Sequence, residues 1–418
     1  MKKLLLSMAA LPLVIGGLSV SASADDGLNI LNNIKVTGQI RPRFENVDDG
    51  SATTANANAY TARTKLSVTA GLLGVDGLTA TLGGIAVSNF GAHGYNDGTT
   101  AYTDGTLPYT KITDPQDAMI SNAAIDYTVN NTSLHAGRGQ VNLDNQRFIG
   151  TVGWRQLERS YDSLYIANNS IKNLSILVAW VYGYAGVANS TTADTNTVLL
   201  HAAYSVMPEL KITAYDYMLA NIHDTYGIAL TGNLNLSGAK LDYRAEYAAQ
   251  GDATMEKGTQ IAGVTGKADA DYYNLDLGAN VNGILAGVNY EVFSGAANAT
   301  ETNFTTPLAT GHKFNGWADV AGSANGGLQD FNIRLGYTAN GLGKILALYH
   351  DFKADVATVA IGDDKGSEID VIYTNKIPGV NNLTGLIKYA DFSKGKVAGT
   401  LNDVQKIWVG LDYKFSVN

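Results

Sequence analysis

The sequence predicts an all-β protein, a closed antiparallel transmembrane β-barrel of about 18 strands, with about 16 and 20 as the bounds. Three observations predict this class. Strand-length segments that alternate apolar and polar residues recur along the chain, and short and long polar connections separate them in turn. The chain also opens on a segment typical of exported proteins, and behind it no apolar run is long enough for a membrane helix.

The opening segment, MKKLLLSMAALPLVIGGLSVSASADD, has the layout of a cleavable signal peptide. Lys2 and Lys3 precede an apolar stretch from Leu4 to Leu18, and small residues end at Ala24. A membrane anchor is the alternative, but proline and glycine interrupt the apolar stretch. We therefore expect residues 1–24 to be removed and residues 25–418 to form a single barrel.

Composition excludes several functions. Loss of residues 1–24 removes two lysines and no acid, so the formal net charge of −9 becomes −9 − 2 = −11. Such an acidic chain is not expected to bind nucleic acid. The chain has no cysteine, and its six histidines show neither metal-ligand spacing nor a HExxH motif. We expect no metal, no cofactor and no enzyme activity; a serine beside His135 or His201 on a strand is the catalytic alternative that the pattern leaves.

The stretch IKVTGQIRPRFE, residues 34–45, shows the alternation most clearly. One face carries Ile34, Val36 and Ile40, and the other carries charged and amide side chains. The same pattern recurs in YTARTKLSVTAGL, AKLDYRAEYA and QKIWVGLDYKF. A soluble sandwich would bury the apolar face, whereas a membrane barrel would turn it to lipid. The recurrence along the whole chain favours the barrel, with outer-membrane lipid as its surroundings.

The connections support the same fold. We place the strands near residues 34, 59, 78, 122, 132, 160, 173, 197, 210, 225, 238, 271, 283, 328, 343, 367, 383 and 404. Short turns at 74–77, 129–131, 207–209, 280–283 and 340–343 alternate with long loops near 46–58, 91–118, 138–158, 249–270, 294–326, 353–366 and 392–403. Outer-membrane barrels have tight periplasmic turns and long extracellular loops, which predicts the orientation of the chain in the outer membrane.

Charged residues lie opposite the apolar faces, and we expect them to line a water-filled lumen. On the first two strands Arg41 and Arg43 come near Arg63 and Lys65, forming a basic strip that would attract anions. Water and loop acids that screen this strip are the alternative. The other inward charges that we single out on later strands are Arg244, Glu246, Asp330, Arg334, Glu368 and Asp370.

One segment carries a resemblance to known proteins. Residues 136–166, AGRGQVNLDNQRFIGTVGWRQLERSYDSLYI, resemble the segment that the Campylobacter-type major outer-membrane porins and the alginate-export-like porins carry after their fifth strand. The matching positions are Gly137, Arg138, Gln140, Asp144, Arg147, Gly150, Trp154, Arg155, Gln156, Tyr161 and Asp162, with Gly139 inserted in the strand end. The C-terminal VGLDYKFSVN is similar to the assembly signal of outer-membrane proteins, although three residues follow Phe415.

The resemblance implies a porin, a water-filled channel for passive diffusion of small hydrophilic solutes and ions, with a weak preference for anions. The loop of about residues 138–158 would fold into the lumen as a constriction. The residues implicated there are Arg138, Asp144, Arg147, Arg155, Glu158 and Arg159. The barrel-assembly machinery would be a partner.

Several alternatives stay open. The loop arginines could instead pair with Asp144, Glu158 and Asp162 and fix the loop. The barrel could be substrate-selective or export a polysaccharide, or it could be a surface structural protein or adhesin with a closed pore. The transported solute, and the choice between a monomer and a homotrimer, are not decided by the sequence.

Overall fold

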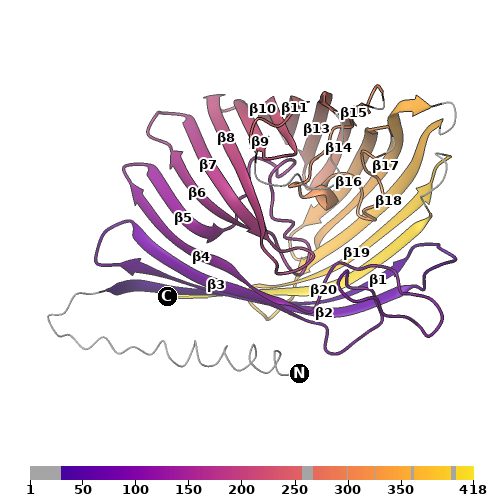
Figure 1. Cartoon of the computed structure of the whole chain (residues 1–418), viewed down its shortest axis with the longest axis horizontal. Coiled ribbons are helices and arrows are strands. Elements are labelled where there is room, and N and C mark those ends of the chain that lie inside the picture. Colours follow the sequence, from indigo (N-terminus) through magenta and orange to yellow (C-terminus); the bar gives the residue numbers. More distant parts are fainter. Residues whose placement is uncertain (1–29, 257–266, 299, 325, 359–361, 397–401) are drawn as a thin grey trace.

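Eighteen strands close into one antiparallel ring in the computed structural model, which describes residues 30–256, 267–298, 300–324, 326–358, 362–396 and 402–418 (Figure 1). The first strand, β1 (Leu31–Asp48), pairs with β2 (Ala57–Leu72) on one side and with the last strand, β20 (Val404–Val417), on the other. This closure confirms the predicted fold class. The expected signal peptide lies outside the described residues.

The remaining strands of the ring follow in chain order. They are β3 (Leu78–Ser88), β4 (Ala118–Val129), β5 (Thr132–Gly139), β6 (Ser160–Asn168), β7 (Leu174–Ala185), β8 (Ala193–Met207), β9 (Leu210–Leu219), β10 (His223–Leu236), β11 (Ala239–Gly251), β13 (Ala270–Val281), β14 (Ile284–Phe293), β16 (Leu328–Ala339), β17 (Gly343–Thr358), β18 (Gly362–Lys376) and β19 (Leu383–Lys394). Two short strands, β12 (Lys267–Ala268) and β15 (Glu301–Thr302), pair with each other and are not part of the ring. A single 3-10 turn, η1, spans Gly311–Lys313. The predicted strand starts differ from these by five residues at most, at β18.

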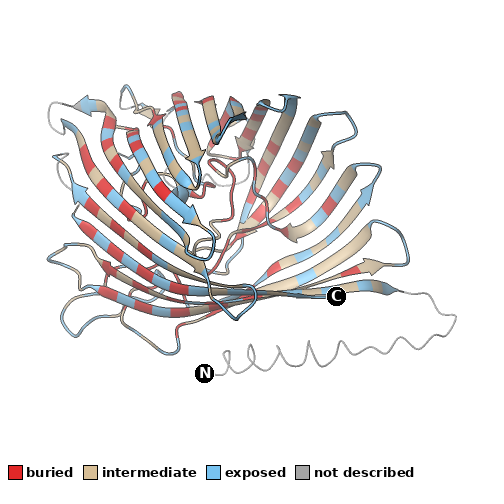
Figure 2. Cartoon of the chain, turned by 180° about the vertical axis from the view of Figure 1, so that it is seen from behind, coloured by how far each residue is buried: buried red, intermediate tan, exposed pale blue. Residues whose placement is uncertain are grey.

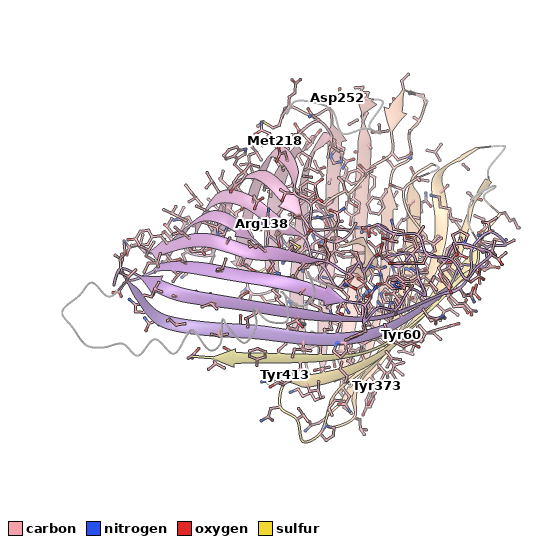
Figure 3. All side chains as sticks on the ribbon, turned by 60° about the horizontal axis from the view of Figure 1, so that its bottom comes forward. Tyr60, Arg138, Met218, Asp252, Tyr373 and Tyr413 are labelled. Carbon is pink, nitrogen blue, oxygen red and sulfur yellow. The ribbon has the colours of Figure 1, made fainter. Side chains whose placement is uncertain are left out.

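Apolar side chains cover the outside of the ring. In β13, Leu275 and Leu277 are 60% and 59% exposed, whereas Tyr272 and Asn274 on the opposite face are 1% and 6% exposed. The same alternation follows the strands around the barrel (Figure 2), and tyrosines such as Tyr413 add to the outer surface (Figure 3). An apolar exterior on a closed ring suits lipid, because all ring strands have partners on both sides. No helix among the described residues is long and apolar enough to cross a membrane.

The connections alternate between short turns at one end of the barrel and longer loops at the other. The N-terminal end of β1 and the C-terminus lie at the same end (Figure 1), as an even number of strands requires. At the end of the barrel that carries the long loops, two connections are short, residues 186–192 and 220–222, and the sequence did not predict them as loops. At seven and three residues, they are much shorter than the loops that the sequence marks as long.

Pro42 lies at the seam where the barrel closes. The β1–β20 register pairs Ile40 with Tyr413 and Arg43 with Gly410, but no pairing is recorded for Arg41 and Pro42 between them. Proline has no N–H to donate, so the ladder is interrupted there. On its other side Pro42 keeps its register with Ala62 of β2.

The core of this protein lies inside the barrel. Two segments that we call inner loop 1 (residues 140–159) and inner loop 2 (residues 303–324) enter the ring after β5 and β15 (Figure 1). Together with inward-facing aromatic residues of the wall they form one buried cluster. Its aromatic members are Tyr95, Phe148, Tyr161, Tyr215, Tyr217, Tyr272, Phe293, Phe304, Trp317, Phe352, Phe392 and Trp408. The ring is wide enough that only loops folded inward can bury these side chains.

Candidate functional site

The two inner loops are bonded to each other in the interior of the ring. The Gly150 N–H donates to the Leu308 carbonyl at 2.9 Å, and the Thr310 N–H donates to the Gln146 carbonyl at 3.1 Å. The Arg159 guanidinium reaches the Pro307 carbonyl at 3.2 Å. The loops therefore form one unit, which we call the inner plug.

The basic strip of β1 and β2 holds inner loop 1. Arg41 donates to the Gly153 carbonyl at 2.9 Å and to the Gln156 side chain at 3.1 Å. Arg43 donates to the Trp154 carbonyl at 2.7 Å. Both arginines face inward as predicted, but they are only 8% and 4% exposed, so the loop covers them rather than open lumen water.

The acidic partner of the second strand is Glu158. Arg63 donates to it at 3.3 Å, and both Lys65 and Gln140 contact its other oxygen. Asp114, from the loop before β4, pairs with Arg43 and accepts the Gln156 N–H at 2.8 Å. The like charges of the strip are thus separated by carboxylates and carbonyls of the loops.

At the β14 wall, Arg147 of inner loop 1 and Glu291 form a buried ion pair. The Arg147 Nε lies 2.8 Å from Glu291 Oε1, and the two residues are 1% and 2% exposed. The guanidinium lies 4.4 Å and 4.7 Å from the ring centres of Phe293 and Phe314. Asn315 of inner loop 2 also donates to Glu291, at 2.7 Å, so one carboxylate joins both inner loops to β14.

Acids of β16 and β18 hold inner loop 2. Glu368 accepts the Ala318 N–H at 2.6 Å, and Asp370 accepts the Trp317 N–H at 3.1 Å. Asp330 lies 2.9 Å from His350 Nδ1. All three acids face inward as predicted and are at most 1% exposed, so here too the plug covers the wall charges.

Arg155 joins the plug to β1. Its guanidinium lies 3.2 Å from Glu45 and 3.1 Å from Asp319 of inner loop 2. Burial lowers the pKa of Arg155, but the carboxylates of Glu45, Asp114 and Asp319 outweigh burial and raise it above its ordinary value. The nearby His312, Lys406 and Arg155 side chains hold the pKa of the Asp319 carboxyl well below its usual range despite its burial.

Of the other predicted charges on the lumen wall, Arg138, Arg244 and Arg334 are partly exposed, whereas Glu246 is buried. Arg138 pairs with Asp162 at 2.6 Å, and its side chain is 18% exposed. Arg334 pairs with Asp276 at 2.6 Å, with its side chain 22% exposed. Arg244 contacts both Glu246, at 2.7 Å, and Asp144 at the tip of inner loop 1.

Several interior residues were missed by the sequence analysis. They are Lys388, His312, Trp317, Asp319 and Trp408. Lys388 and Trp408 lie on strands at positions that alternate with lipid-facing residues, so the period of two could have identified them as inward-facing. Residues 312–319 lie in irregular backbone and carry no periodicity, so no pattern marked them.

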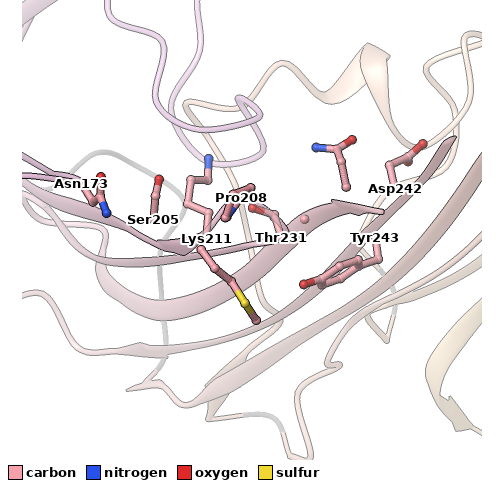
Figure 4. A pocket seen from close by; sticks show the side chains of 10 residues that line it. Asn173, Ser205, Pro208, Lys211, Thr231, Asp242 and Tyr243 are labelled. Carbon is pink, nitrogen blue, oxygen red and sulfur yellow. The ribbon is translucent and has the colours of Figure 1, made fainter. Parts of the chain in front are cut away.

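A recess of about 580 Å³ opens in the wall where β8 to β11 reach the turn end (Figure 4). Its polar side chains are Asn173, Ser205, Lys211, Thr231, Asn233 and Asp242. Lys211 points toward the inner loop drawn above it and lies 3.8 Å from Asp144. Within the described ranges, no group of three or more His, Asp or Glu side chains is arranged to hold a metal ion.

No protein-family model and no curated protein sequence matches this chain. Solved structures do. Pseudomonas aeruginosa OccK8 (OprE) aligns with a TM-score of 0.71 at 16% identity, over 92% of this chain and 99% of that one. P. aeruginosa OpdK with vanillate gives 0.72 at 12%, over 93% and 100%, and Acinetobacter baumannii OccAB4 gives 0.70 at 13%, over 94% and 100%.

At these identities the likeness is one of fold. The matched structures are of the outer-membrane porin type and do not belong to the two porin families that residues 136–166 resemble. The closed ring, its apolar exterior and the shared fold lead to one conclusion. The chain is a multi-pass β-barrel protein of the bacterial outer membrane with the 18-stranded porin fold.

Proposed function

We propose that this protein is an outer-membrane porin through which small hydrophilic solutes and ions diffuse passively past the inner plug. The observation that carries this proposal is a closed, lipid-facing barrel whose inner wall bears charged pairs around two infolded loops. A purely structural barrel has no need of such a polar interior, because packed apolar side chains would fill it at lower desolvation cost. Residues 1–24 are, in this proposal, the cleaved signal peptide.

A weak preference for anions is part of the proposal. Two inward cations with partly exposed side chains are Lys211, at 43%, and Arg334, at 22%. Arginine binds carboxylates in a bidentate manner, and the related fold of OpdK was solved with vanillate. Asp276 and Asp242 lie beside Arg334, so the preference is expected to be modest.

A substrate-selective barrel is the second candidate. It is supported by the inner plug, since loops packed across a ring leave room for chosen solutes rather than for a broad pore. Inner loop 1 also lies within the segment that resembles the Campylobacter-type and alginate-export-like porins, and we keep that resemblance as a proposal. Outer-membrane lipid and the barrel-assembly machinery are the proposed partners, and a homotrimer is the assembly to test against a monomer.

Planar-bilayer recording of the purified full chain tests the proposal. We expect ion conductance and, in a salt gradient, a reversal potential on the anion side. Lys211→Gln should move that potential toward cations, while Lys353→Gln, which removes the same charge from a side chain paired with Asp351 on the outer face of β17, should leave it unchanged. A wild-type chain that conducts no ions would contradict the porin and favour the surface protein or adhesin.

A further inference from the structure

A buried lysine lies between the inner plug and the barrel wall. Lys388 points inward from β19 and is 3% exposed. Its Nζ lies 3.8 Å from the ring centre of Trp317, 4.1 Å from that of Trp154 and 5.1 Å from that of Trp408. Its hydrogen-bond partner is His312 Nε2, at 2.6 Å. Three aromatic faces and one imidazole thus enclose the end of this side chain.

The surroundings of Lys388 are those of an aromatic cation site. Among the residues that the structure describes, no ion pair joins Lys388 to a carboxylate. An ammonium is attracted to the negative face of an aromatic ring, most strongly to that of tryptophan, and the attraction grows when the site is dry. Without such faces, a lone buried ammonium would be strongly destabilising.

The three rings come from three separate segments. Trp154 belongs to inner loop 1, Trp317 to inner loop 2 and Trp408 to β20. Trp154 stacks on His312 at 5.0 Å and meets Trp408 edge to face at 5.8 Å. The chain has four tryptophans, and the fourth, Trp180, is 43% exposed on the outer face. The enclosure therefore exists only while both inner loops are docked.

His312 connects this enclosure to an ion network. Its Nδ1 lies 2.8 Å from Asp319, which in turn lies 3.1 Å from Arg155 and 3.4 Å from Lys406. Burial is the main cause that lowers the pKa of His312, to about 3, so the ring is neutral. A neutral ring donates from Nδ1 to Asp319 and accepts at Nε2 from Lys388, which satisfies both nitrogens.

We propose that Trp154, Trp317 and Trp408 form an ammonium-binding box whose resident ligand is Lys388, and that the filled box latches both inner loops to the barrel wall. The ligand class of the box is a primary organic ammonium ion. The latch follows from these contacts alone; its consequence for conduction, a wider path when the box is empty, rests on the proposed porin function.

Tryptophan fluorescence tests the box directly. In a Trp180→Phe background, with excitation at a wavelength that only tryptophan absorbs, the three box tryptophans alone emit, so acrylamide quenching of the purified full chain reports their exposure. We expect Lys388→Ala to increase quenching several-fold, and n-propylammonium to restore protection in a saturable manner. Propan-1-ol has similar size without charge and should not restore it. Lys388→Met keeps most of the side-chain volume without charge and should behave like Lys388→Ala.

Protection in Lys388→Met equal to that of the wild type would overturn the proposal, because the box would then need no cation. Equal effects of n-propylammonium and propan-1-ol would also overturn it. If neither Lys388 variant assembles, Trp317→Leu, which lies in a loop and not in the wall, should expose the two remaining rings; unchanged quenching there counts against the latch. Bilayer recording of the same proteins separates the two proposals. A wild-type protein that conducts no ions would contradict the proposed porin function. The acrylamide quenching result alone decides whether Lys388 fills the tryptophan box.

Discussion

Removal of Arg147 should release the inner plug without unfolding the barrel. Arg147 makes two contacts of 2.8 Å with Glu291 and one of 2.6 Å with Asn315, and both ions are almost fully buried. Arg147→Ala leaves the Glu291 carboxylate without its cation in a dry site. The ring strands keep their own ladders, so the damage is expected in the inner loops.

The size of the effect follows from the burial. Removing one partner of a buried ion pair costs about 3–5 kcal/mol, because the other charge stays desolvated. Each 1.4 kcal/mol is a factor of about ten, so local opening of the plug should increase by about a hundredfold to several thousandfold. Hydrogen exchange with mass spectrometry, read on peptides from residues 140–159 and 303–324, measures this opening.

A matched double variant makes the test specific. Arg147→Met with Glu291→Gln removes both charges and keeps similar volumes, so exchange should return close to the wild-type rate. Exchange in Arg147→Ala that rises less than about tenfold would refute the reasoning, since the cost of an unpaired buried charge predicts far more. The same conclusion follows if the double variant is as open as the single one.

Two further predictions concern pH and the backbone. In the docked plug, where Asp319, Lys388 and Arg155 face the ring, the pKa of His312 is lowered from 6.5 to about 3. In the undocked plug the same ring binds a proton near pH 6.5. Docking should therefore weaken as the pH falls from 6.5 to 3. Acrylamide quenching should rise over that range in the wild type and stay flat in His312→Gln. Gly137→Ala places a Cβ 2.2 Å from the Ala123 carbonyl at a φ of +127°, costing about 1–3 kcal/mol, so the folded barrel should melt earlier on heating. Gly251→Ala meets nothing within 4 Å and should melt like the wild type.

The strands of this barrel could be predicted because lipid selects a strict pattern. The alternation around Ile40 and Arg41 identifies which side chains face out, and the structure keeps that parity along β1. Turn and loop lengths then set the direction of each strand. Both signals are local, since they depend on neighbours two residues apart and on polar connections.

Contacts of the inward charges could not be predicted in the same way. Arg41 and Arg43 were expected beside lumen water, but their partners are carbonyls more than a hundred residues further along the chain. Inner loop 1 was expected inside the barrel from its resemblance to porin loops. Inner loop 2, which completes the plug, has no period and no motif, so only its partners on the wall identify its place.

The sequence by itself determined the barrel, its approximate number of strands and the side of each strand that faces lipid. The reason is that apolar and polar residues alternate with a period of two along the strands. Only the tertiary structure decided what fills the ring. The Lys388 box needs three tryptophans from residues 154, 317 and 408, and the Arg147–Glu291 pair spans 144 residues. Such groups meet only after the ring has closed and the loops have folded into it, and no local pattern encodes that meeting.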